Sequence, residues 1–381
     1  MKNGYLTWVE VSKSALNHNI KIFRELLGDN VILCPCVKSN AYGHGLVEVA
    51  KTYLESGANW LSVNSIYEAE KLRQAKIKSP IYIMGYVDFE NLEKVVDLNC
   101  RIVMYNIETI EKLNQIAKKK NKEVPIHVKI ESGLNRQGVL DKDLDEFIRK
   151  VREMECIKLE GVCSHLANVE DVTNHEYAKN QLKRFKLSVE KMEKEYGSIP
   201  IKHIANSAAT LLFNDMHFEM VRPGIASYGL WPSKETYISW LEKTGYEIEL
   251  KPAFSWKAKI AQIKEIPAGE YIGYGCAFKS SHKMRIAVIP VGYYDGYDRG
   301  INNGYVLVKG RRAAVLGRIA MNIIVIDVTN FPELEVEDEV VLLGQGEKEN
   351  VSADDIATWA GTINYEITTR VNEMIPRIMV E

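Results

Sequence analysis

The chain has 381 residues, with 49 lysines and arginines against 51 aspartates and glutamates, for a formal net charge of -2. This balance gives no electrostatic argument for binding nucleic acid or an anionic membrane, so we expect neither as a partner. The length allows two domains, one of which could be a barrel of more than about 200 residues.

The cysteines and the hydropathy pattern point to a reducing compartment. The six cysteines are scattered and several lie in apolar runs, which is typical of reduced core residues in a cytoplasmic protein. Cys34 and Cys36 are not at a usual metal-ligand spacing, so no metal site is predicted. No segment approaches about 18 consecutive apolar residues, and the N-terminus has no signal-peptide pattern. We therefore expect a soluble chain, although it could be part of a longer membrane-tethered protein.

Thr7–Val11 alternates like a strand, and Ser12 then caps a helical pattern. Short apolar runs and amphipathic helical stretches alternate after it, as in a (β/α)8 TIM barrel. No Gly-x-Gly-x-x-Gly follows an early strand, so a dinucleotide-binding fold has no support. The eight runs are Val31–Val37, Leu61–Asn64, Ile81–Tyr86, Arg101–Asn106, Ile126–Glu131, Leu159–His165, Ile201–Ser207 and Met220–Tyr228.

In such a barrel the chemistry is expected where the strands end. Polar or charged residues occur at nearly all of these ends, which favours one ligand at the barrel mouth. They are Lys38, Asn64, Asn106, Glu131 with Arg136, His165, Asn206 with Ser207, and Arg222; Gly85 ends the third run.

From about Tyr246 strand-like runs replace the helical patterns, which predicts a second, mostly β domain. We expect the barrel to cover residues 12–240 and the second domain residues 241–381, with Gly229–Thr244 as the crossover. The strand-like runs are Ala253–Ile263, Met284–Val291, Tyr305–Val308, Ala313–Leu316, Ile323–Val328 and Val340–Leu343, and one helical pattern remains at Ala353–Ala360.

Lys38 follows a buried run and precedes a glycine-rich turn, Val-Lys-Ser-Asn-Ala-Tyr-Gly-His-Gly at residues 37–45. Burial favours the neutral amine that imine chemistry with an aldehyde cofactor requires, although a lysine at a strand end can also simply reach solvent. This segment resembles the pyridoxal-phosphate lysine motif of the alanine racemase family. About eight motifs spread over essentially the whole chain match that family in order.

The resemblance implies a homodimer that binds pyridoxal 5'-phosphate, with residues 1–11 joining the second domain. Arg222, in Val-Arg-Pro-Gly-Ile, would face the cofactor's pyridine nitrogen, which a guanidinium cannot protonate, and His165 would hydrogen-bond towards it. Lys129 would be carbamylated and brace Arg136. The residues expected to bind the cofactor are Lys38, Tyr42, Arg136, His165, Asn206, Ser207, Arg222, Gly224, Ile225 and Tyr365.

The segment Tyr-Ile-Gly-Tyr-Gly-Cys-Ala-Phe at residues 271–278 resembles the family's Gly/Ser-Tyr-Gly-x-x-Phe/Tyr motif, which carries a second catalytic base. Racemisation removes a proton from one face of Cα and returns one to the other, so two bases are needed. By resemblance these are Lys38 and Tyr274, the tyrosine coming from the partner subunit. Arg136, Tyr293 and the backbone N–H of Met321 would bind the substrate.

Several residues depart from the family pattern, among them Glu131, Ser132, Ala320 and Asn322. The expected reaction is the interconversion of L- and D-alanine, and Asn322, where the family has aspartate, leaves a serine or broader-specificity amino-acid racemase open. A non-enzymatic pyridoxal-phosphate carrier would lack the second domain. An amino-acid decarboxylase of the same plan would carry a Gly-Gly-Gly phosphate loop, which this chain does not have.

Overall fold

The computed structural model describes residues 4–301 and 303–381, which form two compact units. One unit comprises Ala15–Ala41 and Leu46–Lys251. The other comprises the chain up to Ser14, Tyr42–Gly45 and Pro252–Glu381. Among the described residues, no helix is both long and apolar enough to cross a membrane.

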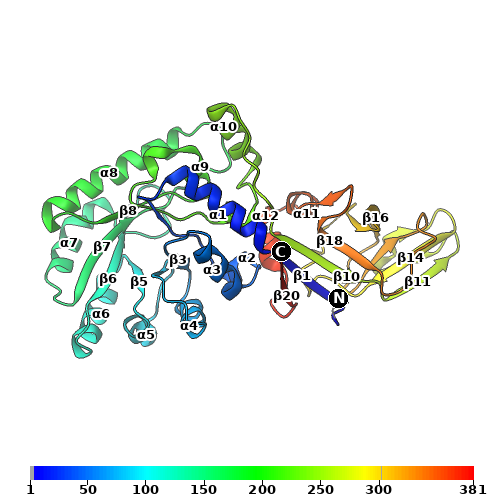
Figure 1. The fold of residues 1–381 in the computed structure, drawn as a ribbon, viewed down its shortest axis with the longest axis horizontal. Coiled ribbons are helices and arrows are strands. Elements are labelled where there is room, and N and C mark those ends of the chain that lie inside the picture. The colour runs from blue at the N-terminus through cyan, green and yellow to red at the C-terminus, as the bar shows by residue number, and fades with distance from the viewer. Residues whose placement is uncertain (1–3, 302) are drawn as a thin grey trace. The chain divides into compact units, whose positions relative to one another are not determined.

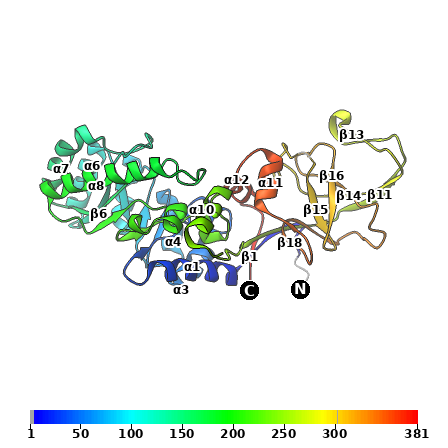
Figure 2. The ribbon, with the colours of Figure 1, turned by 90° about the horizontal axis from the view of Figure 1, so that it is seen from above.

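The larger unit contains eight short parallel strands separated by helices, as the alternating pattern predicts (Figures 1 and 2). β3 (Leu61–Val63) and β4 (Ile81–Ile83) are buried at every position, which is typical of a parallel sheet covered by helices, whereas β7 carries an exposed Lys158. The strands are β2 (Ile32–Leu33), β3 (Leu61–Val63), β4 (Ile81–Ile83), β5 (Arg101–Met104), β6 (Val124–Lys129), β7 (Ile157–Cys163), β8 (Ile201–His203) and β9 (Met220–Val221).

Backbone hydrogen bonds close these strands into a barrel. β3 to β8 form one parallel sheet in chain order, and β2 pairs with β9 in a separate parallel pair. The Ser62 N–H donates to the Pro35 carbonyl (3.0 Å), which joins β2 to β3. The Arg222 N–H donates to the Ala205 carbonyl (3.0 Å), which joins β9 to β8. The predicted (β/α)8 barrel is therefore confirmed.

Helices lie outside the barrel strands in Figure 1, with α8 the longest of them. Their inward faces carry the apolar residues of an amphipathic pattern, for example Leu144, Phe147, Ile148 and Val151 in α7. The helices are α1 (Lys13–Leu27), α3 (Leu46–Glu55), α4 (Ile66–Gln74), α5 (Leu92–Asp97), α6 (Ile107–Lys119), α7 (Leu144–Arg152), α8 (Glu176–Tyr196), α9 (Ser207–Leu212) and α10 (Lys234–Thr244).

The second unit is built on one mostly antiparallel sheet, with strand order β11-β14-β17-β16-β15-β18-β10-β1-β20. β1 pairs antiparallel with β10 and parallel with β20. The bounds are β1 (Thr7–Ser12), β10 (Phe254–Lys259), β11 (Gln262–Ile266), β12 (Tyr271–Ile272), β13 (Phe278–Lys279), β14 (Met284–Ile289), β15 (Tyr305–Val308), β16 (Arg311–Leu316), β17 (Ile324–Asp327), β18 (Glu339–Gln345), β19 (Asn350–Val351), α11 (Ala353–Ala360), α12 (Asn364–Arg370) and β20 (Arg377–Val380).

One expected strand in this unit is two strands in the structure. The apolar run Ala253–Ile263 breaks after Lys259, where β10 leaves its pairing with β1 and β18 and the chain enters β11, which pairs with β14. The Ile260 N–H donates to the Asp338 carbonyl (3.0 Å) at this corner. Continuous hydropathy could not reveal the break, because both segments remain in the same sheet.

Candidate active site

Lys38 follows the first barrel strand, five residues after β2 ends at Leu33, where the backbone turns into the left-handed region. Ser39, Asn40 and Ala41 have φ values of 55°, 54° and 54°. Left-handed backbone costs an L-residue roughly 1–2 kcal/mol each, so three in succession require support from the surroundings. The Leu46 N–H donates to the Asn40 side-chain oxygen (2.9 Å), which supports the end of the segment.

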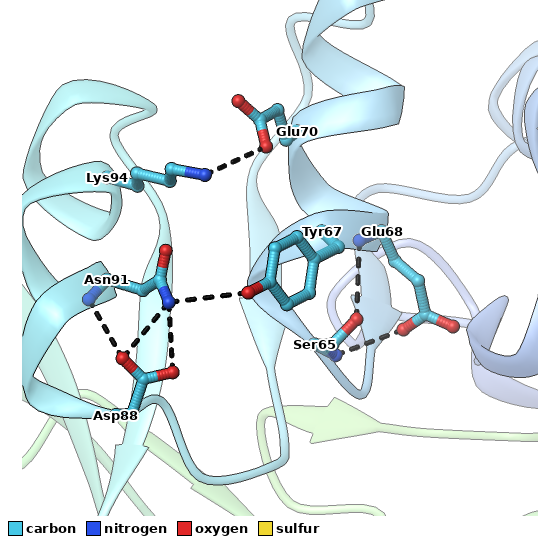
Figure 3. Close-up of polar contacts among 7 residues, drawn as sticks. All are labelled: Ser65, Tyr67, Glu68, Glu70, Asp88, Asn91 and Lys94. Carbon is cyan, nitrogen blue, oxygen red and sulfur yellow. Dashed lines mark hydrogen bonds and ion pairs between the residues drawn. The ribbon is translucent and has the colours of Figure 1, made fainter.

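Glu68 of α4 supports the beginning of the same segment. Its carboxylate accepts the Ser39 N–H (2.6 Å), the Asn64 N–H (2.8 Å) and the Ser65 N–H (3.0 Å). Figure 3 shows Glu68 beside Ser65, whose hydroxyl caps the helix in return. The Ser-x-x-Glu spacing is the sequence signature of a capping box, but it could not reveal that the carboxylate also binds the residue after Lys38.

The opposite side of α4 makes ordinary surface contacts, which Figure 3 shows together with Glu68. Glu70 accepts from the Lys94 ammonium (3.3 Å), and Tyr67 accepts from the Asn91 amide (3.4 Å). Asp88 caps the turn before α5 through the Asn91 N–H (3.1 Å). These contacts join α4 to the next βα loop and do not involve a predicted site residue.

Arg222 follows β9 and is buried. Its guanidinium donates to the Ser164 carbonyl (2.9 Å) and to Nδ1 of His203. The structure differs here from the expected hydrogen bond with His165, because the neighbouring strand β8 ends in His203 and presents its imidazole directly to Arg222. His203 lies within the expected run Ile201–Ser207, but the sequence pattern does not indicate its contact with Arg222.

His165 follows β7, close to several charged residues of the barrel mouth. Burial and then the positive charges of Arg222, Arg136, Lys129 and Lys38 hold the pKa of its imidazole well below the ordinary value. Each of these four cations is therefore close enough to His165 for its charge to act on the ring. The structure thus gathers Lys38, Lys129, Arg136, His165 and Arg222, residues spread along almost two hundred positions, at one end of the barrel.

Lys129 ends β6 and is buried, and burial lowers the pKa of its ammonium. It donates to the Gln137 side-chain oxygen (3.1 Å). In the same loop, Glu131 accepts the N–H groups of Gly133 (2.5 Å) and Arg136 (3.3 Å), so the departure from aspartate at this position still organises the loop. Arg136 itself is exposed.

Ser207, Gly224, Ile225 and Asn206 form a second group on the barrel unit. The Ser207 hydroxyl accepts the Gly224 N–H (2.8 Å) and the Ala226 N–H (3.3 Å), which draws the loop after β9 onto the start of α9. Ile225 opens a short buried helical turn, Ile225–Tyr228. Asn206 caps α9 through the Ala209 N–H (3.0 Å) and donates to Glu170 (2.7 Å), so its side chain already has structural partners.

The other predicted residues belong to the second unit. The rings of Tyr42 and Tyr365 lie 6.2 Å apart between centroids, and Tyr42 is buried. Tyr42 is also left-handed, with a φ of 52°. Gly43 after it has no room for a side chain, because a Cβ would lie 2.0 Å from the Thr368 carbonyl oxygen. The lysine-motif glycine therefore serves packing against α12, which carries Tyr365.

Tyr274 lies in a turn between β12 and β13, and its side chain is 67% exposed. Gly275 after it has a φ of 70°, and a Cβ there would lie 2.9 Å from a guanidinium nitrogen of Arg318. The Gly-Tyr-Gly motif therefore combines left-handed backbone with close packing.

Tyr293 and Met321 lie on two loops of the second unit that are bonded together. The Tyr293 N–H donates to the Ala320 carbonyl (3.1 Å), and a Cβ on Gly292 would lie 2.2 Å from the same oxygen. The Asn322 amide donates to Asp295 (3.1 Å), so this departure from the family's aspartate completes the loop pairing. Tyr293 is 41% exposed and Met321 is 55% exposed.

Metal ligation has no visible basis in this site. In residues 4–301 and 303–381, no group of three histidine, cysteine, aspartate or glutamate side chains is arranged to hold a metal ion.

Comparison with known proteins places this geometry in a family. The "Alanine racemase, N-terminal domain" profile matches residues 11–232, and the "Alanine racemase, C-terminal domain" profile matches residues 253–379. A curated alanine racemase of Leptospira interrogans (serovar copenhageni) is 40% identical over 386 residues, covering 100% of this chain and 97% of the relative. One from Halothermothrix orenii is 40% identical over 372 residues, covering 97% of this chain and 96% of the relative.

Solved structures agree with the sequence comparison. An alanine racemase of Clostridium difficile 630 superposes with a TM-score of 0.93 at 35% identity, covering 100% of this chain and 97% of the other. An alanine racemase from D-cycloserine-producing Streptomyces lavendulae superposes with a TM-score of 0.93 at 31% identity, covering 100% and 98%. Both domain profiles, in the expected order, and full-length relatives support one conclusion: the chain belongs to the alanine racemase family.

Proposed function

We propose that this chain is a pyridoxal-phosphate-dependent racemase that interconverts L- and D-alanine. The observation that carries the proposal is the position of Lys38, Lys129 with Arg136, His165 and Arg222 at or after the ends of four different barrel strands, with Arg222 and Lys129 buried. The positive charges of the lysines and arginines also help to lower the pKa of His165. The family is pyridoxal-phosphate dependent, and its curated relatives are named alanine racemases.

The residues present fit this cofactor. The cationic donors of the barrel mouth suit an anionic, ring-bearing ligand, and Arg222 has contacts to a carbonyl and an imidazole, which leave its positive charge unneutralised by a directly bonded carboxylate. The Ser207 hydroxyl accepts the Gly224 N–H and keeps its own proton, which it can donate to a phosphate. Bound there, the cofactor supplies an electron-withdrawing ring that increases the acidity of the substrate's Cα–H bond.

Within the proposed mechanism, the Lys38 amine would hold the cofactor covalently and exchange a proton with one face of the substrate Cα. Arg136 would bind a carboxylate with its planar fork of donors. Arg222 would face the pyridine nitrogen and, because a guanidinium keeps its proton, would leave that nitrogen unprotonated. Tyr42 and Tyr365, whose rings lie 6.2 Å apart between centroids, are also proposed to bind the cofactor.

The opposite face of Cα would be served by Tyr274 of a partner subunit, so we propose a homodimer. The 67% exposure of Tyr274 in the single chain supports this assignment, because an isolated phenol in solvent has no substrate to act on. Tyr293 and Met321, both exposed, would line the substrate side of the same surface. Carbamylation of Lys129 is a further part of the proposal, supported by its buried position and the lowered pKa of its amine.

We also propose that the enzyme works in the cytoplasm. All six cysteines are free thiols, five of them buried or partly buried, which supports a reducing compartment. A barrel domain followed by a mostly β domain, with the N-terminal strand joining the second domain, completes the proposed organisation.

One experiment tests the function directly. The purified chain, loaded with pyridoxal phosphate, is incubated with each L-amino acid in deuterated water, and exchange and inversion at Cα are followed. Exchange with inversion, fastest for alanine, is the expected result. Fastest inversion of serine would indicate a serine racemase, release of carbon dioxide a decarboxylase, and absence of exchange a cofactor carrier.

A further inference from the structure

Two histidines lie in the interior of the barrel, beneath the proposed site. His127 of β6 and His203 of β8 are both fully buried, and their ring centroids lie 4.9 Å apart. The ring of Tyr82 packs against both, at 4.9 Å from His127 and 5.3 Å from His203. Gly161 makes room for them, because a Cβ at that position would lie 2.4 Å from Nδ1 of His127.

These histidines belong to a continuous hydrogen-bond network that begins at Arg222. The guanidinium contacts Nδ1 of His203, and Nε2 of His203 lies 2.7 Å from Nδ1 of His127. Nε2 of His127 then lies 3.3 Å from Oε2 of Glu160. Arg101 ends the network by donating to both oxygens of Glu160, at 3.1 Å and 3.4 Å.

The hydrogen bonds of this network are donated in one direction, from Arg222 through His203 and His127 to Glu160. Arg222 can only donate, so Nδ1 of His203 must accept and its proton must be on Nε2. That proton is donated to Nδ1 of His127, which leaves the His127 proton on Nε2, directed at the Glu160 carboxylate. Both imidazoles are therefore neutral, and each has a partner for both of its nitrogens.

The charges that face the pair agree with neutral imidazoles. Burial, with the positive charge of Arg222 next, lowers the pKa of His203 well below its ordinary value. Burial also lowers the pKa of His127, although Glu160 opposes it. The titratable and charged groups that act on the two rings or contact them are Tyr82 from β4, Arg101 from β5, Lys129 from β6, Glu160 from β7 and Arg222 after β9.

We propose that His203, His127 and Glu160 are positioning residues that fix the guanidinium of Arg222 against a neutral acceptor. The inference rests on the proposed function, in which Arg222 faces the cofactor ring. A carboxylate bonded directly to Arg222 would neutralise much of its charge, whereas here the carboxylate is two imidazoles away. Arg222 is thereby oriented by hydrogen bonds, while its positive charge remains directed at the ligand.

The first test uses the unaltered chain without cofactor. Nitrogen NMR of histidine-labelled protein is expected to show His203 and His127 with protonated Nε2 and unprotonated Nδ1, unchanged from pH 8 down to about 6. Protonation of either ring near its ordinary pKa of about 6.5, or a proton on Nδ1 of His203, would overturn the inference. This result does not depend on racemase activity, so it separates the inference from the proposed function.

The second test compares variants of the residue one step removed from Arg222. His127→Leu removes the hydrogen bonds to His203 and Glu160, whereas His127→Gln can still accept from His203 and donate to Glu160. His217→Leu is the matched control, because His217 is another buried histidine of the barrel unit, bonded to the Thr210 carbonyl (2.8 Å).

His127→Leu is expected to lower kcat about tenfold or more while KM changes less than about twofold, and to shift the pH dependence of the bound cofactor's absorption. His127→Gln is expected to restore most of both properties, and His217→Leu to change stability alone. Equal kinetics and absorption for His127→Leu and His217→Leu would overturn the inference. An unaltered chain without racemase activity would instead overturn the proposed function, and the NMR result would still decide the hydrogen bonds.

Discussion

Removal of the Glu68 carboxylate is predicted to loosen the backbone that carries Lys38. Glu68 accepts three backbone N–H groups, from Ser39, Asn64 and Ser65, of which Asn64 and Ser65 come directly before its own helix. Glu68→Ala removes all three acceptors at once. Glu70→Ala is the matched control, because Glu70 lies on the same helix and pairs with Lys94 across the surface (Figure 3).

The expected magnitude follows from these contacts. Loss of the helix-capping acceptors costs about 0.5–2 kcal/mol, and loss of the bond to Ser39 adds about 1 kcal/mol, because that donor lies in strained backbone but is reached by water. The total is about 1.5–3 kcal/mol of unfolding free energy. A surface ion pair contributes about 0–1 kcal/mol, so Glu70→Ala is expected to be nearly neutral.

Activity is expected to fall more than stability alone explains. Ser39, Asn40 and Ala41 hold roughly 3–6 kcal/mol of left-handed strain in total, and without Glu68 part of this strain can be released by moving the Lys38 backbone. A displacement near 1 Å at a reacting group can cost about a hundredfold in rate. We therefore expect kcat of Glu68→Ala to fall at least about tenfold.

The assay combines urea unfolding followed by circular dichroism with racemisation of L-alanine by the loaded enzyme. Glu68→Gln, which retains one oxygen acceptor, is expected to lie between the wild type and Glu68→Ala in both measurements. If Glu68→Ala matched Glu70→Ala in unfolding free energy and in kcat, the argument that Glu68 supports the lysine turn would be refuted.

Three further predictions concern other parts of the chain. Tyr274→Phe is expected to leave cofactor binding intact but to abolish proton removal from one enantiomer far more than from the other; normal rates in both directions of alanine racemisation would contradict the two-base assignment. Asn322→Asp replaces the amide donor to Asp295 (3.1 Å) with a second carboxylate, and repulsion between the two carboxylates raises the pKa of one of them. The variant should therefore lose more stability at pH 7 than at pH 4, which denaturant unfolding at the two pH values would measure. The folded-state pKa values of His127 and His203 lie below those of the unfolded chain, so their contribution to stability is complete above about pH 6.5. As the pH falls below this, the unfolding free energy should decline by up to about 1.4 kcal/mol per pH unit for each histidine. An unfolding free energy that stayed constant from pH 7 to pH 5 would contradict their burial as neutral rings.

The sequence alone determined the order of strands and helices in the barrel, because a strand covered on both faces must be apolar throughout and a covering helix must be apolar on one face. It also identified Lys38 and Arg222 as strand-end residues, since the apolar run before each ends at a charged side chain. The break in Ala253–Ile263 was not predictable, because hydropathy does not record a change of pairing partner.

Only the tertiary structure decided which side chains meet inside the barrel. Glu68 carries the local signature of a helix cap, and its bond to Ser39 depends on where two βα loops come together. His127, Glu160 and Arg101 are separated from Arg222 by between 62 and 121 positions in the sequence. They join one hydrogen-bond network because β5, β6, β7 and β8 are neighbours in the sheet and the loop after β9 bonds to β8. Sequence periodicity fixes which residues face inwards, but the neighbour of an inward side chain is set by strand register and closure.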